Sequence, residues 1–195
     1  GTIYSSTTIC TNYPNPPSGC PQWVDGKVGK ALSFDGVDDY VIVPYASSLD
    51  TPNGLTVSAW IFDDNCVQGH SINRDTSPRI WIIRAESCSA GNWHIWNSNG
   101  ILTQLVPPFS WAQNKWFFFV GTAQVVSGNI TMKYYFNGNE VGKTSFAGTS
   151  IQTGNVPLMM GGWQGVGFFK KQFLDEVRVY NRALSDAEIK ALYDS

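Results

Sequence analysis

The stretch Phe173-Leu-Asp-Glu-Val-Arg-Val-Tyr180 alternates in the manner of a β-strand, which gives its residues two faces. We expect one face to be shared by Phe173, Asp175, Val177 and Val179. Asp175 is unusual on this otherwise apolar face, because a carboxylate without a partner is costly to bury among apolar side chains. Either a cation or a ring of backbone N–H groups must therefore offset its desolvation.

The residues that follow, Asn181-Arg-Ala-Leu-Ser-Asp-Ala-Glu-Ile-Lys-Ala-Leu-Tyr193, change to helical spacing. Apolar side chains recur along one side of this segment, at Leu184, Ala187, Ile189 and Leu192. Ser185 and Glu188 form a capping box, in which each side chain satisfies a backbone N–H that the first turn leaves free. We therefore predict a closing strand followed by a terminal helix.

Short runs with strand character, separated by close turns, fill the chain before this segment. The apolar run Trp116-Phe-Phe-Phe-Val120 is typical of a strand covered on both faces. We expect residues 1–22 to be irregular and the polar segment from Asp63 to Asp75 to be a loop. Strands are expected at residues 30–34, 40–43, 55–62, 79–84, 93–96, 101–105, 116–120, 130–136, 140–144 and 156–162.

This pattern of many short strands and one helix predicts an all-β fold, a two-sheet antiparallel jelly-roll sandwich. The 195 residues show no composition break, so we expect one domain over residues 1–195, in a mature or trimmed form that begins at Gly1. The formal net charge of -2 argues against nucleic acid as a partner. The absence of a long apolar run argues against membrane insertion.

The sequence has 4 cysteines without the spacing of a zinc site: Cys10, Cys20, Cys66 and Cys88. Of the possible pairings, we expect the two sequential ones, each of which closes a polar loop. Closing a loop of about 15 residues stabilises a protein by roughly 3 kcal/mol in the chain-entropy model. The alternative is a set of buried free thiols. Disulfides form in oxidising compartments, so the sequence predicts a secreted or cell-surface protein.

Four blocks of the chain resemble the laminin-G-like, or concanavalin A-like, jelly-roll family, and they stand in the family's order over about residues 26–193. The blocks are Gly26-Lys-Val-Gly-Lys-Ala-Leu-Ser-Phe-Asp-Gly-Val-Asp-Asp-Tyr-Val41, Leu55-Thr-Val-Ser-Ala-Trp60, Tyr135-Phe-Asn-Gly-Asn-Glu140 and the closing segment from Phe173 to Ile189. The resemblance implies two packed sheets, one concave and one convex. It leaves the function open, because the fold serves lectins, carbohydrate-binding modules, adhesins and some glycosidases.

The resemblance also implies a structural calcium ion, held by the Asp of the Phe-Asp-Gly turn and the Asp of the closing strand. In this sequence those residues are Asp35 and Asp175, and Asp38 on the same turn is the third ligand that we expect. Lys170 and Lys171 would weaken such a site if they point at it. In the alternative, Asp35 and Asp38 cap their own turn and Asp175 accepts backbone N–H bonds.

Motifs for catalysis are lacking. A glycosidase needs two carboxylates that flank the scissile bond. Asp175 and Glu176 are adjacent, and neighbours on a strand point to opposite faces. Neither His70 nor His94 has a Ser or Cys in a recognisable nucleophile setting. We therefore expect a protein that is not an enzyme.

Aromatic residues are abundant, with 8 Trp, 8 Tyr and 11 Phe. Most of these rings are expected in the core. A few exposed rings would stack on the apolar face of a sugar, while polar side chains bond to its hydroxyl groups. The ligand-binding residues that we predict are Asp63, Arg79, Arg84, His94, Trp96 and Trp163. For each of them the alternative is a core ring or a solvated charge.

The leading hypothesis is a non-catalytic, lectin-like domain that binds an oligo- or polysaccharide on the concave face. Such a domain would sit beside other domains of a larger extracellular protein. A second hypothesis is a structural or protein-binding adhesion domain of a surface or pilus protein, with a flat face and no sugar pocket. A third is a small glycosidase. An exposed aromatic cleft favours the first hypothesis, and aromatic residues that are all buried favour the second.

Overall fold

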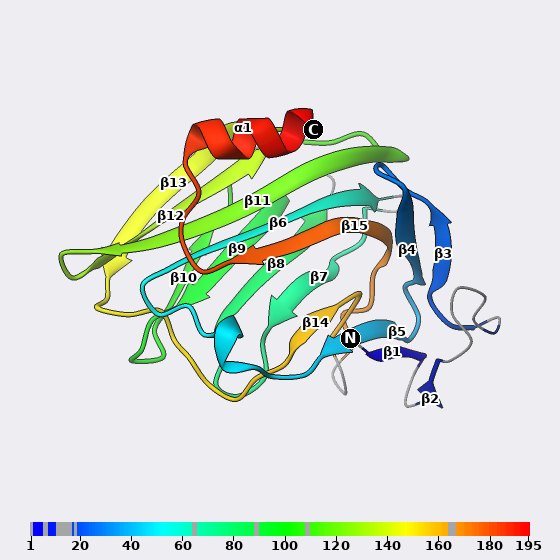
Figure 1. Ribbon diagram of the computed structural model, residues 1–195, viewed down its shortest axis with the longest axis horizontal. Coiled ribbons are helices and arrows are strands. Elements are labelled where there is room, and N and C mark those ends of the chain that lie inside the picture. Colours follow the sequence, from blue (N-terminus) through cyan, green and yellow to red (C-terminus); the bar gives the residue numbers. More distant parts are fainter. Residues whose placement is uncertain are drawn as a thin grey trace.

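The computed structural model describes residues 2–5, 8–10, 17, 19–63, 66–87, 90–107, 110–163 and 167–195. One short 3-10 helix, η1 (Ser47–Leu49), and one α-helix, α1 (Asp186–Asp194), accompany the strands (Figure 1). The strands are β1 (Thr2–Ser5), β2 (Thr8–Ile9), β3 (Gln22–Asp25), β4 (Lys30–Asp35), β5 (Asp39–Val43), β6 (Gly54–Asp63), β7 (Gly69–Arg74), β8 (Trp81–Ser87), β9 (Ala90–Trp96), β10 (Leu102–Leu105), β11 (Lys115–Val126), β12 (Asn129–Phe136), β13 (Asn139–Ala147), β14 (Leu158–Met160) and β15 (Lys171–Tyr180).

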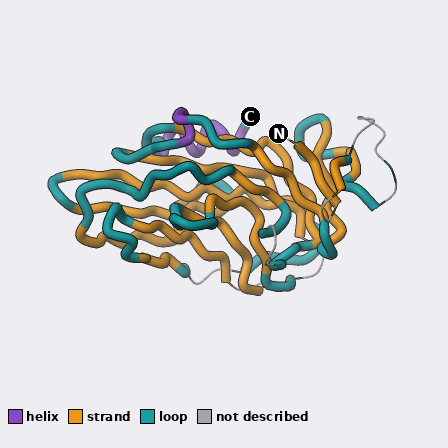
Figure 2. Tube along the Cα trace, turned by 90° about the horizontal axis from the view of Figure 1, so that it is seen from below, coloured by secondary structure: helices purple, strands orange, loops and turns teal. Residues whose placement is uncertain are grey.

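The strands form two antiparallel sheets, which confirms the predicted jelly-roll sandwich. The eight-stranded sheet has the order β10-β9-β8-β7-β14-β5-β1-β2, and the seven-stranded sheet has the order β13-β12-β11-β6-β15-β4-β3. The strands lie in stacked layers with α1 at one side (Figure 2). No helix among the described residues is both long and apolar enough to cross a membrane.

One apolar core fills the space between the sheets, because each strand directs alternate side chains inward. The inward residues of β8 and β9 include Trp81 and Trp93, both fully buried. On β11, Phe117 and Phe119 belong to this core, whereas Phe118 belongs to a second cluster on the other face of the strand. The prediction that this apolar strand is covered on both faces is confirmed.

Helix α1 covers the outer face of the seven-stranded sheet. Its buried Ile189 and the preceding Leu184 pack against outward side chains of that sheet, among them Trp60. The predicted capping box is present, because the Ser185 side chain accepts from the Glu188 N–H and the Glu188 side chain accepts from the Ser185 N–H. The helix therefore covers part of this face and leaves a pocket of about 260 Å³ beside Trp60, Phe118 and Leu192.

Strand β15 differs from the alternation predicted for it. The register with β6 shifts between Asp175 and Arg178, and Glu176 adopts a positive φ of 49°. Such a bulge inserts one residue and reverses the phase of those that follow. Leu174 and the later Val177 and Val179 therefore pack on the core. The prediction that Phe173 and Asp175 share a face with these two valines is wrong.

Two segments expected to be irregular contain strands. Residues 1–22 include β1 and β2, and β1 pairs with β5. The polar segment from Asp63 to Asp75 includes β7, whose Ser71, Asn73 and Arg74 are buried. Each of these three side chains makes a buried hydrogen bond, for example Asn73 Nδ2 to the carbonyl of Gly162 at 2.9 Å. Polar side chains with such partners are compatible with a central strand.

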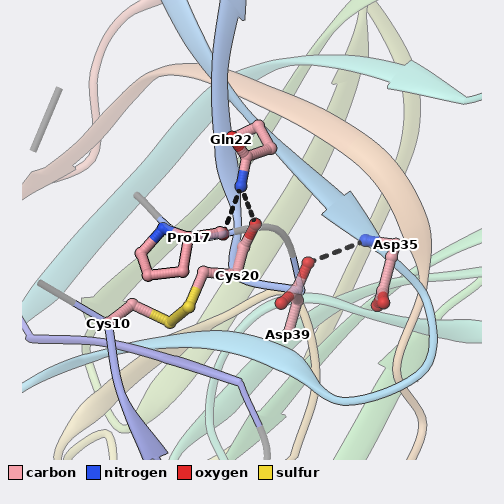
Figure 3. The surroundings of a disulfide bond; sticks show 6 residues. All are labelled: Cys10, Pro17, Cys20, Gln22, Asp35 and Asp39. Carbon is pink, nitrogen blue, oxygen red and sulfur yellow. Dashed lines mark hydrogen bonds between the residues drawn. A yellow bond between two sulfur atoms is a disulfide. The ribbon is translucent and has the colours of Figure 1, made fainter. Parts of the chain in front are cut away.

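A disulfide joins the edges of the two sheets. Cys10 follows β2 and Cys20 precedes β3, and these are the last strands of the two sheet orders. Their Cα atoms lie 6.0 Å apart, and beside the bridge Gln22 Nε2 donates hydrogen bonds to the carbonyls of Pro17 and Cys20 (Figure 3). The predicted Cys10–Cys20 pairing is thus present. Cys66 is also disulfide-bonded, and Cys88 lies outside the described residues.

Candidate functional site

The outer face of the eight-stranded sheet presents polar and aromatic side chains over β7 to β10. On β9, Trp93 and Ile95 point into the core, so His94 and Trp96 point outward. The register places Gln104 of β10 opposite His94. It also places His70 of β7 opposite Arg84 of β8. Four strands therefore contribute to one outward surface.

This surface is hollowed by two adjoining pockets, of about 440 and 290 Å³. We call them together the outer cleft. Both pockets are lined by Asp75, Arg79, Trp96 and Trp163. The remaining lining residues are Ser77, Pro78, Gly100 and Gln152 in the first pocket and His70, Ile82, Arg84, His94, Leu102, Gln104 and Phe168 in the second.

One wall of the outer cleft is a cluster of three nearly parallel rings. The imidazole of His70 lies parallel to the rings of Trp163 and Phe168, with centroids 5.6 and 5.1 Å away. The segment that carries Trp163 is held close to the sandwich by Gly161, where a Cβ would lie only 2.3 Å from Phe34 Cδ1. Phe168 is 40% exposed, so its ring is accessible to a ligand.

Arg79 crosses the outer cleft between two indoles. Its guanidinium carbon lies 5.8 Å from the Trp96 ring centroid and 5.2 Å from that of Trp163. Its Nε lies 3.4 Å from Oδ1 of the buried Asp75. Burial raises the pKa of Asp75 to about 6, and the charges of Arg79 and Arg84 oppose that rise. Asp75 is therefore mostly ionised at neutral pH.

Two buried imidazoles line the outer cleft with nitrogens that have no hydrogen-bond partner among the described residues, His70 Nδ1 and His94 Nε2. The two side chains are only 1% and 3% exposed. Burial lowers the pKa of His70 to about 3 and that of His94 to about 4, and the nearby Arg84 adds to both shifts. Both rings are therefore neutral at pH 7. A buried polar atom without a partner is rare and calls for one, such as a ligand or water.

Most of the residues predicted to bind a ligand meet here, because Arg79, Arg84, His94, Trp96 and Trp163 all line the outer cleft. Asp63 does not line it. Asp63 is buried, forms an ion pair with Lys170 at 2.9 Å and accepts from Trp111 Nε1 at 3.2 Å. The structure thus assigns Asp63 to the interior, and Lys170 points to Asp63.

The lining residues that sequence reasoning missed include His70, Asp75 and Phe168. His70 and Asp75 were assigned to a polar loop, because the strand that leads to Asp75 lacks an apolar alternation. Phe168 lies beside the cleft because Trp163 and Gly167 pair in an isolated antiparallel bridge. The sequence pattern does not indicate this pairing. A register prediction for β7 and β8 would have placed His70 beside Arg84.

A second cluster of functional groups lies on the turn between β4 and β5. The carboxylate oxygens of Asp35, Asp38 and Asp39 lie within 4.8 Å of one another. Asp39 Oδ2 accepts from the N–H of Asp35 at 3.0 Å (Figure 3), whereas its buried Oδ1 has no partner among the described residues. Burial raises the pKa of Asp39 to about 7, and the charges of Asp35 and Asp38 contribute. A cation would satisfy the buried oxygen and offset the repulsion, so the three carboxylates fit a metal ion such as calcium.

The structure does not bring Asp175 into this cluster. Asp175 is 4% exposed, and its Oδ2 accepts from the N–H of Val28 in the turn between β3 and β4 at 2.8 Å. The register pairs Asp35 with Lys171, four positions before Asp175 on β15. At about 3.3 Å per residue this separates the two aspartates by on the order of 13 Å. The structure therefore groups Asp39, and not Asp175, with Asp35 and Asp38.

Similar solved structures share the fold of this chain. The binding domain of Paraclostridial Mosquitocidal Protein 1 is 17% identical with a TM-score of 0.69, and the match covers 98% of this chain and 52% of that chain. The receptor binding domain of botulinum neurotoxin C/D mosaic serotype is 15% identical with a TM-score of 0.70, and the match covers 99% and 50%. That of botulinum neurotoxin type G is 11% identical with a TM-score of 0.67, again over 99% and 50%.

The chain therefore spans about half the length of these domains, and the likeness at such low identity shows the fold alone. No curated protein matches the sequence. The family model of the concanavalin A-like lectin/glucanases superfamily matches residues 35–190. The match includes strands β7 to β10, which carry the outer cleft, and the acidic turn, and the chain belongs to this superfamily.

Proposed function

We propose that this domain binds carbohydrate in the outer cleft and that it is a binding module without catalytic activity. The observation that carries the proposal is the pairing of exposed rings with unsatisfied buried polar atoms. His70 Nδ1 and His94 Nε2 face a cleft whose wall is formed by Trp163 and Phe168. A sugar offers the matching surfaces, since it has an apolar face of C–H groups and a rim of hydroxyl groups.

The aromatic rings and the polar groups of the outer cleft would contact different parts of the sugar. A sugar ring stacks on Trp163 and Phe168, the latter being the more exposed of the rings that line the outer cleft. Its hydroxyl groups bond to His94 Nε2, which as a neutral imidazole nitrogen either accepts or donates according to its tautomer. Trp96 is only 6% exposed, and its place beneath Arg79 suits a supporting role rather than direct stacking.

A glycosidase on this face would need a second carboxylate across the cleft. Among the described residues that line the outer cleft, Asp75 is the only carboxylate, and it forms an ion pair with Arg79. The aromatic cleft also distinguishes the proposal from an adhesion domain with a flat face. Binding without catalysis is therefore the function that this arrangement supports best.

We further propose that Asp35, Asp38 and Asp39 hold a structural calcium ion. The support is the carboxylate cluster and the buried, unpartnered Oδ1 of Asp39. None of these three aspartates is among the lining residues of the outer cleft, so we expect the ion to stabilise the fold without touching the sugar.

The setting that we propose is a secreted or cell-surface protein in which this domain is one part. Two observations support it. The Cys10–Cys20 disulfide is typical of proteins that fold in oxidising compartments. The similar structures are described as binding or receptor binding domains, and the chain matches about half of each.

A glycan array with calcium present tests the proposed binding. The wild-type domain is compared with Trp163→Ala and His94→Ala, which remove a stacking ring and a polar contact. Trp23→Ala is the matched control, because Trp23 is 39% exposed on β3 of the other sheet. We expect defined glycan hits that the first two variants lose and the control keeps.

Thermal melts of each variant show whether a loss of binding reflects unfolding. Hits that Trp163→Ala and His94→Ala both retain would move the site away from the outer cleft. A wild-type domain that binds none of the glycans would contradict the proposed function and favour a protein partner.

A further inference from the structure

The outer cleft carries a surplus of positive charge in a protein that is acidic overall. At neutral pH its charged lining residues in the described chain are Arg79 and Arg84 against Asp75, which gives 2 − 1 = +1. His70 and His94 do not add to this charge, because burial keeps both rings neutral at pH 7. The whole chain has a formal net charge of -2. A positive cleft in a negative molecule favours a ligand of negative charge.

Arg79 is held in the geometry that recognises an oxyanion. The two indoles of Trp96 and Trp163 flank its guanidinium, and the contact with Asp75 is made through Nε. Neither Nη nitrogen of Arg79 donates a hydrogen bond to the described residues, and the side chain is 51% exposed. The open edge of a planar guanidinium donates two parallel N–H bonds to a carboxylate, sulfate or phosphate oxygen pair.

Arginines that serve only structure look different in this protein. Arg74 is fully buried and donates to the carbonyls of Leu49, Gly154 and Val156. Arg178 on the outer face of the other sheet is engaged by Glu176. Arg79 combines flanking rings, an Nε near Asp75 and Nη nitrogens that donate no hydrogen bond to the described residues, all within a cleft. Its arrangement is that of a ligand-binding group.

We propose that the ligand of the outer cleft is an acidic glycan, whose carboxylate or sulfate group binds to the Nη edge of Arg79. The sugar ring that bears the acidic group then lies beside Trp163, and its hydroxyl groups reach the neutral imidazole of His94. This inference rests on the proposed function, since it names the class of sugar for the same cleft.

The first test changes the ligand and leaves the protein intact. Unsulfated chondroitin, chondroitin sulfate, carboxyl-reduced chondroitin sulfate and carboxyl-reduced chondroitin are measured beside an array of neutral, sialylated and uronic-acid glycans. We expect acidic glycans to bind roughly tenfold or more tightly than their neutral counterparts, because charge-assisted bidentate bonds are strong. Comparison of the four chondroitin forms shows whether the protein binds the carboxylate or the sulfate group. If another acidic glycan binds instead, its carboxyl-reduced and desulfated forms are compared in the same way.

The second test removes the open edge of Arg79. Arg79→Gln should reduce the ratio of acidic to neutral binding to near one, and Arg79→Lys, which keeps the charge but loses the fork, should leave an intermediate ratio. Arg178→Gln is the matched control and should leave the ratio unchanged. The ratio is informative even if a variant is less stable, provided that it is measured below its melting temperature.

The possible outcomes distinguish a failure of this inference from a failure of the proposed function. Neutral glycans that bind as tightly as acidic ones would overturn the inference and leave carbohydrate binding intact. The inference would also fall if Arg79→Gln kept the full preference for acidic glycans. A domain that binds no glycan of either kind would overturn both the inference and the proposed function.

Discussion

The two outer faces of this sandwich are both rich in aromatic rings, but only one is covered. On the seven-stranded sheet, Trp60 and Phe118 lie beneath α1, and Tyr193 of the helix stacks on Trp60 at 5.5 Å. On the eight-stranded sheet, Trp163 and Phe168 border the outer cleft beside imidazole nitrogens without partners among the described residues.

The difference lies in what accompanies the rings. Beneath α1, Leu184 and Ile189 pack on the rings and Tyr135 donates a hydrogen bond to Asp186, and the small Ser58 Oγ is a buried polar atom without a partner among the described residues. In the outer cleft, Arg79, His70 and His94 present donors or acceptors that the described chain leaves open. The comparison indicates that aromatic content alone does not identify a binding face, whereas rings beside unsatisfied imidazoles and a half-exposed arginine in one cleft do.

The largest expected effect is the contrast between two tryptophan substitutions. Trp60→Ala should lower the free energy of unfolding by about 3–5 kcal/mol, because a large buried ring leaves a cavity. It should leave glycan binding intact below its melting temperature. Trp163→Ala should change the free energy of unfolding by no more than about 1 kcal/mol and abolish binding. Urea unfolding and glycan titration measure the two effects, and a large stability loss in Trp163→Ala would show that its ring is a core element.

Calcium provides the next largest effect, at a turn separate from both aromatic faces. At about 100 times its dissociation constant, calcium should stabilise the domain by roughly 2.7 kcal/mol. Asp39→Asn should abolish most of this gain. Asp175→Asn should weaken the domain but keep the calcium gain, because Asp175 bonds to Val28 N–H instead of joining the cluster. Thermal melts with calcium and with chelator measure the gain, and equal losses in both variants would return Asp175 to the ligand set.

The buried imidazole of His94 should make the open face sensitive to acid. Its pKa is lowered to about 4 in the folded protein, mainly by burial, and an unfolded histidine titrates near 6.5. The unfolded chain therefore takes up the proton first, and stability is lost as the pH falls from about 6.5 toward 4. The pocket around His94 is also lined by the charged or titratable side chains of Arg79, Arg84, Asp75 and His70. The contribution of His94 alone is therefore obtained by comparing the wild type with a variant at this position.

We expect the stability of the wild type relative to His94→Gln to fall by about 1–2 kcal/mol between pH 7 and pH 5. Urea unfolding at the two pH values gives this difference, in which the titration of groups common to both proteins largely cancels. A difference that does not change with pH would mean that His94 is as accessible to protons in the folded state as in the unfolded one.

The smallest effect is expected at the start of α1. Ser185→Ala removes the capping bond to the Glu188 N–H and should cost about 1 kcal/mol of stability. Glycan affinity should stay the same, because the helix lies on the covered face. Denaturant unfolding and glycan titration check both statements. A change in affinity would mean that the two outer faces are coupled.

Much of this organisation could be predicted from the sequence, because local patterns determine it. The β12–β13 turn at Asn137-Gly138 and the capping box at Ser185 and Glu188 rest on residue types and spacing alone. The grouping of His94 with Trp96 followed from strand alternation. These features depend on neighbours within a few positions in the chain.

Features set by distant contacts could not be predicted. The bulge at Glu176 reverses the face of Val177, and its cause lies in the pairing of β15 with two other strands. Asp63 resembles a surface carboxylate in the sequence, and only the fold brings it to Lys170. Trp96 was a natural choice for a binding residue, but its burial means that Trp96→Ala would disturb both stability and the support of Arg79.

The central claim, that the uncovered face binds carbohydrate, is tested most directly by following the tryptophan indole N–H signals in a two-dimensional NMR spectrum. The domain is titrated with the glycan that binds most tightly in the array, and single Trp→Phe variants assign the signals. We predict shifts for Trp163 and Trp96 and unchanged signals for Trp60 and Trp23. Shifts confined to Trp60 or Trp23, with Trp163 and Trp96 unmoved, would contradict the account and place the ligand on the other sheet.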